Sequence, residues 1–226
     1  MTEEGPRLSL YTYWRSSAAY RVRIALNLKQ LAYQSIPVHL VRGGGEQHSE
    51  AFLAVNPQGR VPVLVHDDQV LTQSMAICEY LDEQFGDEQS GHHKLLPDEP
   101  LKRAAVRSLA LQVACEIHPM NNLSVQKFLQ AGFGDRFDAT AWMTHWMTEG
   151  FAAIEERLNS FDKGNTPLSD DHPGLFECFL VPQVYNADRF QVDMAAFPEI
   201  CRIVSHCKAL SAFIDAAPEN QADAVP

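Results

Sequence analysis

The most constraining feature of this sequence is a strand pattern that runs, after a short polar segment, into a helix pattern. Residues 8–13 alternate apolar and polar side chains and are rich in aromatic groups, which is typical of a half-buried strand. Residues 19–28 repeat apolar side chains at helical spacing, and Ser16 and Ser17 stand where a helix takes its N-cap. Such a helix start directs unpaired backbone N–H groups and a positive dipole end toward one point. We therefore predict an anion-binding site there, with simple capping by the two serines as the alternative.

A second strand and a hairpin are predicted to complete a small α/β sheet. Residues 33–40 are expected to form a strand close enough to the first to make a βαβ unit, and residues 61–65 and 70–72 are expected to form a hairpin. Another helix is predicted from residue 73, with Ser74 as its cap. The glycine run at residues 43–45 lacks the pattern of a phosphate loop and predicts a flexible connection.

A polar, proline-containing linker is predicted at residues 85–100, and the pattern beyond it is helical nearly to the end of the chain. The proline of His118-Pro119 should interrupt the first helix of this region. Met143 and Met147 belong to a stripe at helical spacing, which indicates packing. The predicted helical segments are 101–129, 140–158, 174–190 and 198–214, and residues 216–226 are expected to fray.

Composition excludes several classes of function. A net charge of −11 argues against binding to nucleic acid or to an anionic membrane. No apolar run is long enough to span a bilayer and no signal-peptide pattern is present, so a cytoplasmic location is expected. The five scattered cysteines predict neither disulfides nor a zinc site, and Cys78, Cys115 and Cys178 are expected to be buried small hydrophobic residues. The adjacent pair His92 and His93 does not predict a metal site either.

The segment from residue 13 to residue 28 resembles the signature of a known enzyme family. Its Tyr-Trp-Arg-Ser-Ser, followed by Tyr-Arg-Val-Arg-Ile-Ala-Leu, is similar to the zeta-class glutathione transferases, also called maleylacetoacetate or maleylpyruvate isomerases. In that family Ser-Ser-Cys is usual, and Ala18 here replaces the cysteine. Further matches follow in order at residues 56–62, 73–81, 119–125 and 180–198. The resemblance implies the glutathione transferase fold, with an α/β thioredoxin-like N-terminal domain at 1–88, a linker at 89–100, an all-α C-terminal domain at 101–226, and the site between the domains.

The resemblance also implies glutathione as the cofactor and assigns residues to it. The serine pair would hold the glutathione sulfur as a thiolate, and Ser16 is preferred over Ser17 as the hydroxyl that donates to it. The bond between Val61 and Pro62 is expected to be cis, as in the thioredoxin-like fold. The implied glutathione-binding residues are Ser16, Ser17, Gln47, Val61, Pro62, Gln73, Ser74, His118, Asn122 and Ser124.

Catalytic roles are implied for Ser16 and Ser17 together with Arg15 and Arg189. The two arginines would orient a small anionic maleyl substrate and offset the negative charge that develops on it. Residues 1–42 carry six Lys or Arg against two acidic residues, which fits either a basic pocket for such anions or scattered surface charge. For at least one of Arg21 and Arg23, a surface or interdomain ion pair is the favoured interpretation.

The leading functional interpretation is glutathione-dependent cis–trans isomerisation of maleylacetoacetate, in tyrosine and phenylalanine breakdown, or of maleylpyruvate, by a homodimer. A general glutathione transferase acting on α-halo acids or other electrophiles is the first alternative, and it would consume glutathione. A non-catalytic glutathione-transferase-like binding protein is the second, suggested by Ala18 in place of cysteine. If the glutathione sulfur is the nucleophile, the alanine should be harmless.

Overall fold

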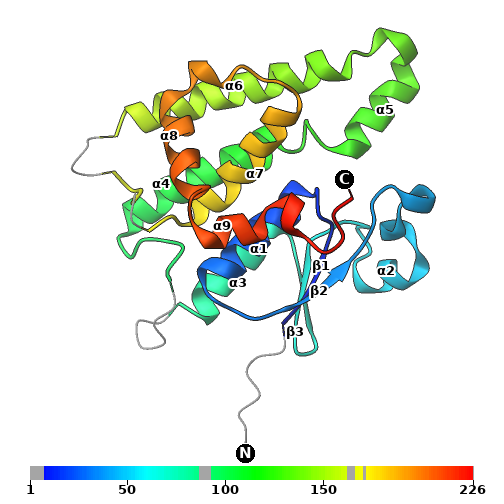
Figure 1. The fold of residues 1–226 in the computed structure, drawn as a ribbon, viewed down its shortest axis with the longest axis horizontal. Coiled ribbons are helices and arrows are strands. Elements are labelled where there is room, and N and C mark those ends of the chain that lie inside the picture. The colour runs from blue at the N-terminus through cyan, green and yellow to red at the C-terminus, as the bar shows by residue number, and fades with distance from the viewer. Residues whose placement is uncertain (1–7, 87–92, 162–165, 170–171, 226) are drawn as a thin grey trace, which may run out of the picture. The chain divides into compact units, whose positions relative to one another are not determined.

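The computed structural model describes residues 8–86, 93–161, 166–169 and 172–225, and the chain divides into two compact units (Figure 1). The first unit comprises Met1–Leu95 together with Leu210–Pro226, and the second comprises Leu96–Ala209. The helical unit thus ends at Ala209, whereas the sequence analysis extended it to residue 226. Part of the expected linker at 89–100, including His92, lies outside the described residues.

A four-stranded sheet forms the centre of the first unit. Its strands are β1 Leu8–Thr12, β2 Gln34–Pro37, β3 Val63–His66 and β4 Gln69–Thr72, in the order β2-β1-β3-β4. Strand β1 runs parallel to β2 and is joined to it through helix α1 Ser17–Leu28, which confirms the predicted βαβ unit. Strands β3 and β4 form the predicted antiparallel hairpin, and β3 also pairs antiparallel with β1.

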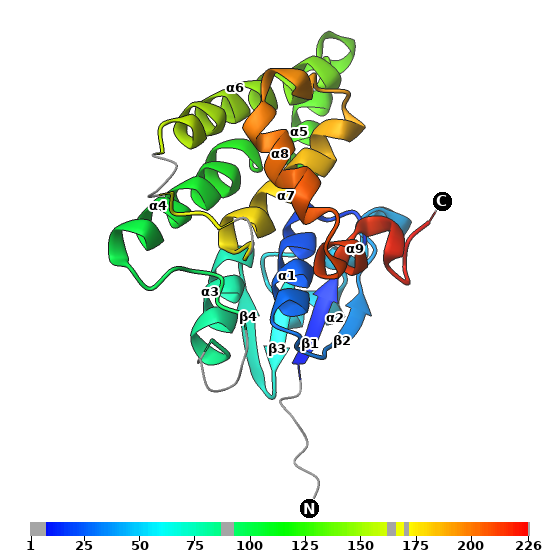
Figure 2. The same ribbon diagram turned by 60° about the vertical axis from the view of Figure 1, so that its left-hand side comes forward.

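Helices lie on both faces of this sheet. The burial of β1 alternates, so that Leu8, Leu10 and Thr12 face one side and Tyr11 faces the other. Tyr11 contacts Phe52 of α2 Glu50–Val55, with ring centroids 5.9 Å apart. The opposite face carries α1, which packs against α3 Ser74–Gln84 and against α9 Ser211–Ala216 (Figure 2).

The glycine run forms two ordered turns, where the sequence predicted a flexible connection. The 3₁₀ turns η1 Arg42–Gly44 and η2 Glu46–His48 follow each other directly, and all three glycines have positive φ. A Cβ atom at Gly45 would collide with the side-chain amide of Gln47. Glycine is favoured at position 45 by its positive φ of 110°, and any larger residue would also displace the side-chain amide of Gln47.

A buried ion pair closes the end of α1 against α3. Lys29 has a fully buried side chain, and its Nζ lies 3.0 Å from Asp82 Oδ1 and donates to the His93 carbonyl at 2.8 Å. Asp82 Oδ1 also accepts a hydrogen bond from the Leu95 amide at 2.7 Å. One carboxylate thus connects α1, α3 and the chain that leaves the first unit.

The second unit contains the helices α4 Pro100–Leu111, η3 Gln112–Ile117, α5 Leu123–Phe133, α6 Ala139–Asn159, α7 Leu175–Arg189 and α8 Pro198–Cys207, with short 3₁₀ turns η4 Gly134–Arg136 and η5 Met194–Ala196. The predicted interruption at His118-Pro119 is confirmed, because the π-helical turn η3 ends at Ile117 and α5 begins only at Leu123.

Met143 and Met147 are buried, as predicted. Cys115 is exposed, so its predicted burial is wrong. In the described part of the chain, no helix is both long and apolar enough to cross a membrane.

The end of the chain differs from the sequence prediction in two ways. The single helix predicted at 198–214 is broken into α8 and α9, because the apolar side of α9 is buried against α1 rather than within the helical unit. The tail does not fray: it continues through η6 Pro218–Asn220, and Gln221 Nε2 donates to the carbonyls of Asp215 and Ala217 at 2.8 and 2.9 Å. Apolar periodicity alone could not show which unit the segment joins.

Helix α8 receives its N-terminal cap from another helix. Phe197 stands at its N-cap position and offers no side-chain acceptor. Instead, the carboxylate of Glu155 on α6, which is 7% exposed, accepts the amides of Glu199 at 2.9 Å and Ile200 at 3.0 Å. A carboxylate at a helix N-terminus accepts hydrogen bonds from backbone amides that have no acceptor within the helix. Its negative charge also interacts favourably with the positive end of the helix dipole.

We expect Glu155→Ala to lower the free energy of unfolding by about 2–3 kcal/mol, because the partly buried Glu199 amide and the buried Ile200 amide lose a charged acceptor. The measurement is chemical denaturation followed by circular dichroism. The neighbouring Glu156 is exposed and serves as the matched control, since Glu156→Ala should change the unfolding free energy by less than about 0.5 kcal/mol. Equal effects of the two substitutions would contradict a capping role for Glu155.

Candidate functional site

The start of α1 has the geometry that the sequence predicted. Ser16 is the N-cap, and its Oγ accepts the Ala19 amide at 3.2 Å. Because this bond uses a lone pair of the hydroxyl oxygen, the hydroxyl proton is still available to a ligand. The amides of Ser17 and Ala18 have no acceptor within the helix, and none is found for them among the described residues. The helix start therefore presents one hydroxyl donor and two backbone donors.

The loop before Ser16 is held by a buried arginine. Arg23 is fully buried, and its guanidinium donates to Thr12 Oγ1 at 3.0 Å, to the Trp14 carbonyl at 3.0 Å and to the Ala216 carbonyl at 2.9 Å. Arg21 is also buried, at 2% exposure, and donates to Ser74 Oγ at 3.1 Å. Both side chains are buried, so neither arginine forms the surface ion pair that was one of the two expectations for at least one of them, and the interdomain ion pair stays a prediction.

Arg15 has a different environment from the two arginines of α1. Its side chain is exposed, and its guanidinium carbon lies 4.8 Å from the centroid of the Trp14 ring. Stacking on an aromatic face restrains a guanidinium while leaving its N–H groups accessible. Arg15 can therefore present a positive charge beside the helix start.

The start of α3 corrects one detail of the sequence prediction. Gln73, with φ 68°, takes the N-cap position, and Ser74 is the first helical residue. Ser74 is therefore not the cap, and its hydroxyl oxygen accepts from Arg21 instead. Gln73 is exposed, and its side-chain amide donates to Gln58 Oε1 at 2.9 Å.

Three further predicted residues lie in the first unit, close to the sheet. The peptide bond between Val61 and Pro62 is cis, as predicted. Val61 packs in one hydrophobic cluster with Tyr13, the residue that begins the loop before Ser16. Gln47 is 8% exposed, and its Nε2 donates to the Leu40 carbonyl at 3.4 Å. Its Oε1 is buried without a partner in the described part of the protein, so it can accept a hydrogen bond from a ligand.

These donors and acceptors fit a bound glutathione. A thiolate or carboxylate needs N–H or O–H donors, which the start of α1 provides, and an amide or ammonium N–H needs an acceptor, which Gln47 Oε1 provides. The parts of this arrangement are connected within the unit, because Tyr13 and Val61 belong to one hydrophobic cluster and Arg21 donates to Ser74.

The remaining predicted residues lie in the second unit and have local partners. Asn122 is the N-cap of α5, and its Oδ1 accepts from the amide and the hydroxyl of Ser124 at 2.9 and 2.7 Å. His118 is half-buried directly after η3. Arg189 is exposed at the last position of α7, where it donates to Asn186 Oδ1 at 3.4 Å. Capping accounts for the residue types at 122 and 124 even without a ligand.

No cysteine of the first unit is suited to nucleophilic chemistry. Cys78 of α3 is fully buried, and the loss of solvation raises the pKa of its thiol to about 12. The thiol is therefore neutral at physiological pH. Among the described residues, no group of three His, Cys, Asp or Glu side chains could hold a metal ion.

Sequence reasoning missed the residues that hold the loop before Ser16 and the start of α3. Arg21 and Arg23 interrupt an otherwise apolar helical pattern, and that interruption was a usable signal for buried arginines. Asp223, whose Oδ2 accepts the Trp14 amide at 3.0 Å, had no sequence signal, because 209 positions separate the two residues.

Comparison with known proteins identifies the family. Residues 10–89 match the model of the glutathione S-transferase N-terminal domain. The chain is 46% identical over 217 residues to the maleylacetoacetate isomerase of Pseudomonas aeruginosa, covering 96% of this chain and 98% of that protein. It is 43% identical over 218 residues to a maleylpyruvate isomerase of a Ralstonia species, covering 96% and 99%.

Solved structures agree with this assignment. The holo structure of a bacterial zeta-class maleylpyruvate isomerase has 41% identity and a TM-score of 0.88, covering 96% of this chain and all of that one. The maleylacetoacetate isomerase of Anaeromyxobacter dehalogenans, solved with dicarboxyethyl glutathione and citrate in its active site, has 37% identity and a TM-score of 0.81, covering 98% and 99%. The chain belongs to the zeta class of glutathione S-transferases, the family of the maleylacetoacetate and maleylpyruvate isomerases.

Proposed function

We propose that this protein is a glutathione-dependent cis–trans isomerase that converts maleylacetoacetate to fumarylacetoacetate or maleylpyruvate to fumarylpyruvate. The observation that carries the proposal is the helix start at Ser16, which offers a hydroxyl donor and two open amides in a chain closely similar to such isomerases over nearly its whole length. Ala18 agrees with it, because position 18 contributes a backbone amide there, and alanine supplies that group as well as cysteine does.

The start of α1 favours the ionised form of a bound thiol. When bound, glutathione supplies a thiolate that adds reversibly to the cis double bond of the maleyl group, so that the bond can rotate and the cofactor is regenerated. A free thiol with a pKa near 8.5 is only a few per cent ionised at neutral pH. Donation by the Ser16 hydroxyl, together with the helix dipole, should lower the thiol pKa by about one to two units. Serine acts here as a hydrogen-bond donor, since its own pKa is too high for a base.

Fixed cations are needed to receive the substrate, which carries carboxylates. Arg15, directly before the serine pair, and Arg189 are proposed to orient these carboxylates and to offset the negative charge that develops on the substrate. The relative from Anaeromyxobacter dehalogenans holds citrate and a dicarboxyethyl derivative of glutathione, which supports an anionic substrate. His118, Asn122 and Ser124 are proposed as further contacts to glutathione or substrate. We also propose a cytoplasmic homodimer, as the family resemblance implies.

The test of the function follows the absorbance of maleylacetoacetate and of maleylpyruvate at a glutathione concentration far below that of the substrate. We expect many substrate molecules to be isomerised per glutathione, with the free thiol unchanged at the end. Stoichiometric loss of the thiol with α-halo acids, without isomerisation, would instead indicate a general transferase. Glutathione binding without any turnover would indicate a binding protein, and either result would refute the proposed isomerase.

A further inference from the structure

The C-terminal segment of the chain is built onto the first helix of the first unit. Asn27 Nδ2 of α1 donates to the Ala212 carbonyl at 3.0 Å, and Arg23 Nε donates to the Ala216 carbonyl at 2.9 Å. Phe213 and Ala216 of α9 are buried. The last residues of the chain therefore have a fixed position relative to α1 and to the loop before it.

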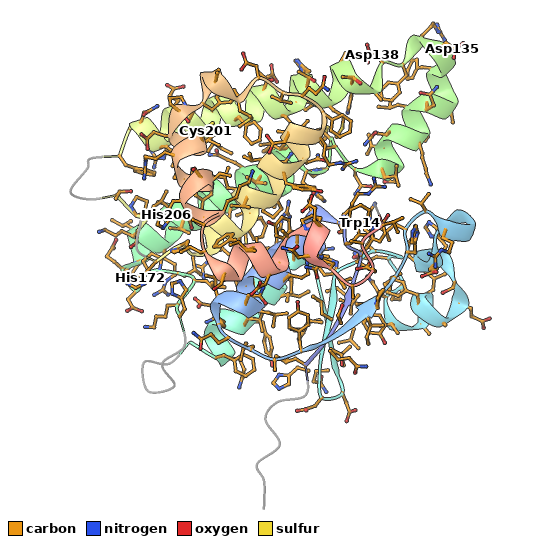
Figure 3. The ribbon with its side chains drawn as sticks, viewed as in Figure 1. Trp14, Asp135, Asp138, His172, Cys201 and His206 are labelled. Atoms are coloured by element: carbon orange, nitrogen blue, oxygen red, sulfur yellow. The ribbon has the colours of Figure 1, made fainter. Side chains whose placement is uncertain are left out.

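The tail then reaches that loop directly. The Asp223 carboxylate accepts the backbone amide of Trp14 at 3.0 Å, two residues before the Ser16 N-cap; Trp14 is labelled in Figure 3. The carbonyl of the same residue accepts from Arg23 at 3.0 Å. Both polar backbone groups of Trp14 are thus held by charged side chains. Tyr13 is held as well, because its carbonyl accepts the Ser16 amide at 2.9 Å.

The position of Asp223 is itself fixed by the turn that precedes it. The side-chain amide of Gln221 donates to the carbonyls of Asp215 and Ala217, and the Gln221 carbonyl accepts the Ala224 amide at 3.0 Å. Asp223 is partly buried between these anchored residues. The carboxylate therefore has little freedom to leave the Trp14 amide.

We propose that Asp223 is a positioning residue for the glutathione site: by holding the Trp14 amide, it fixes the direction in which the Ser16 hydroxyl and the first amides of α1 point. This inference rests on the proposed function, because it assumes that those donors face the glutathione sulfur. Hydrogen-bond donors act on a developing or bound anion only when they are held within a few tenths of an ångström. Without the carboxylate, the Trp14 amide would turn to water and the loop would sample other conformations.

The test compares Asp223→Ala and Asp223→Asn with wild type in the full-length protein. The readouts are the dissociation constant of glutathione by calorimetry, the ultraviolet absorbance of the bound thiolate as the pH is varied, and kcat and KM for isomerisation. For Asp223→Ala we expect about tenfold weaker glutathione binding, because the helix start would make about one charge-assisted hydrogen bond fewer to the glutathione sulfur. We also expect the thiolate to form at higher pH. Asp223→Asn should recover most of both properties, because its side-chain oxygen still accepts the amide.

Asp215 provides the matched control. It is an exposed acid on α9, in the same C-terminal segment, so Asp215→Ala removes the same charge from the same region. This variant should bind glutathione as wild type does. If Asp223→Ala lowers only the melting temperature and leaves the dissociation constant and the thiolate titration at wild-type values, the residue is merely structural and the inference is overturned. Failure of the proposed function is distinct, since wild type itself would then bind glutathione without isomerising the maleyl substrates.

Discussion

Replacement of Ser16 by alanine is expected to lower kcat/KM for isomerisation by about 10- to 100-fold, because a hydrogen bond to a charged group contributes roughly 1.5–3 kcal/mol. The hydroxyl oxygen accepts a hydrogen bond from the Ala19 amide, and the hydroxyl can at the same time donate a hydrogen bond to the glutathione thiolate. Its removal should also shift the pH dependence of kcat/KM upward, since a larger share of the bound thiol would be neutral at pH 7. The measurement is a pH series of initial rates at saturating and limiting glutathione.

The loss of capping must be separated from the loss of the donor. Ser16→Ala also removes the N-cap of α1, which should lower the free energy of unfolding by about 1 kcal/mol. Ser16→Gly is the matched control, because glycine caps a helix only a few tenths of a kcal/mol less well than serine and yet has no hydroxyl. We expect Ser16→Gly to be as inactive as Ser16→Ala but more stable. Normal activity in Ser16→Gly would exclude the hydroxyl as the donor.

Ser17→Ala decides between the two serines. In the described part of the structure, the Ser17 hydroxyl has no hydrogen-bond partner. The backbone amide of residue 17 is present whether that residue is serine or alanine, so Ser17→Ala leaves this donor at the helix start. The substitution should therefore reduce kcat/KM much less than Ser16→Ala does. If Ser17→Ala lowered kcat/KM more than Ser16→Ala, Ser17 rather than Ser16 would be the hydroxyl donor to the thiolate.

Local signals explain which parts of the fold could be predicted. The alternation at β1, the helical spacing of α1 and the Ser16 cap depend on residues within a few positions of one another, and each was predicted correctly. The break between α8 and α9 was missed, since apolar spacing continues across it and tertiary packing decides which unit each helix joins. The cap of α3 was misplaced by one residue, because the positive φ of Gln73 is a conformation that sequence rarely reveals for a residue other than glycine.

In the candidate site, too, local features could be predicted and long-range contacts could not. Ser16 and the cis bond before Pro62 follow from a local motif and a family resemblance. The contacts that hold the loop do not: Asp223 meets Trp14 across 209 positions, and Arg23 meets Ala216 across 193. Such contacts exist only after the tail has packed on α1, so no periodicity or short motif carries them. Residues at the start of α1 were therefore accessible to sequence reasoning, and residues that contact this region from distant parts of the chain were not.

Arg23→Met is expected to lower the free energy of unfolding by about 3–5 kcal/mol, because it leaves several buried acceptors without a donor. Methionine fills much of the space of the aliphatic chain but cannot donate to Thr12 Oγ1, to the Trp14 carbonyl or to the Ala216 carbonyl. The loss is a large part of the roughly 5–15 kcal/mol that stabilises a typical domain. Urea denaturation followed by circular dichroism measures it.

Two further arginine variants separate geometry from charge. Arg23→Lys keeps the positive charge but cannot reproduce the planar guanidinium fork, which donates to several acceptors in different directions, so its stability should lie much nearer to that of Arg23→Met than to that of wild type. Arg15→Met removes an exposed guanidinium eight positions earlier and should change the unfolding free energy by less than about 0.5 kcal/mol. If Arg23→Lys were as stable as wild type, the buried charge rather than the directed hydrogen bonds would hold the loop. The positive charge alone would then stabilise the packing of the tail on α1. The directed hydrogen bond from Arg23 to the Trp14 carbonyl would not be needed for stability.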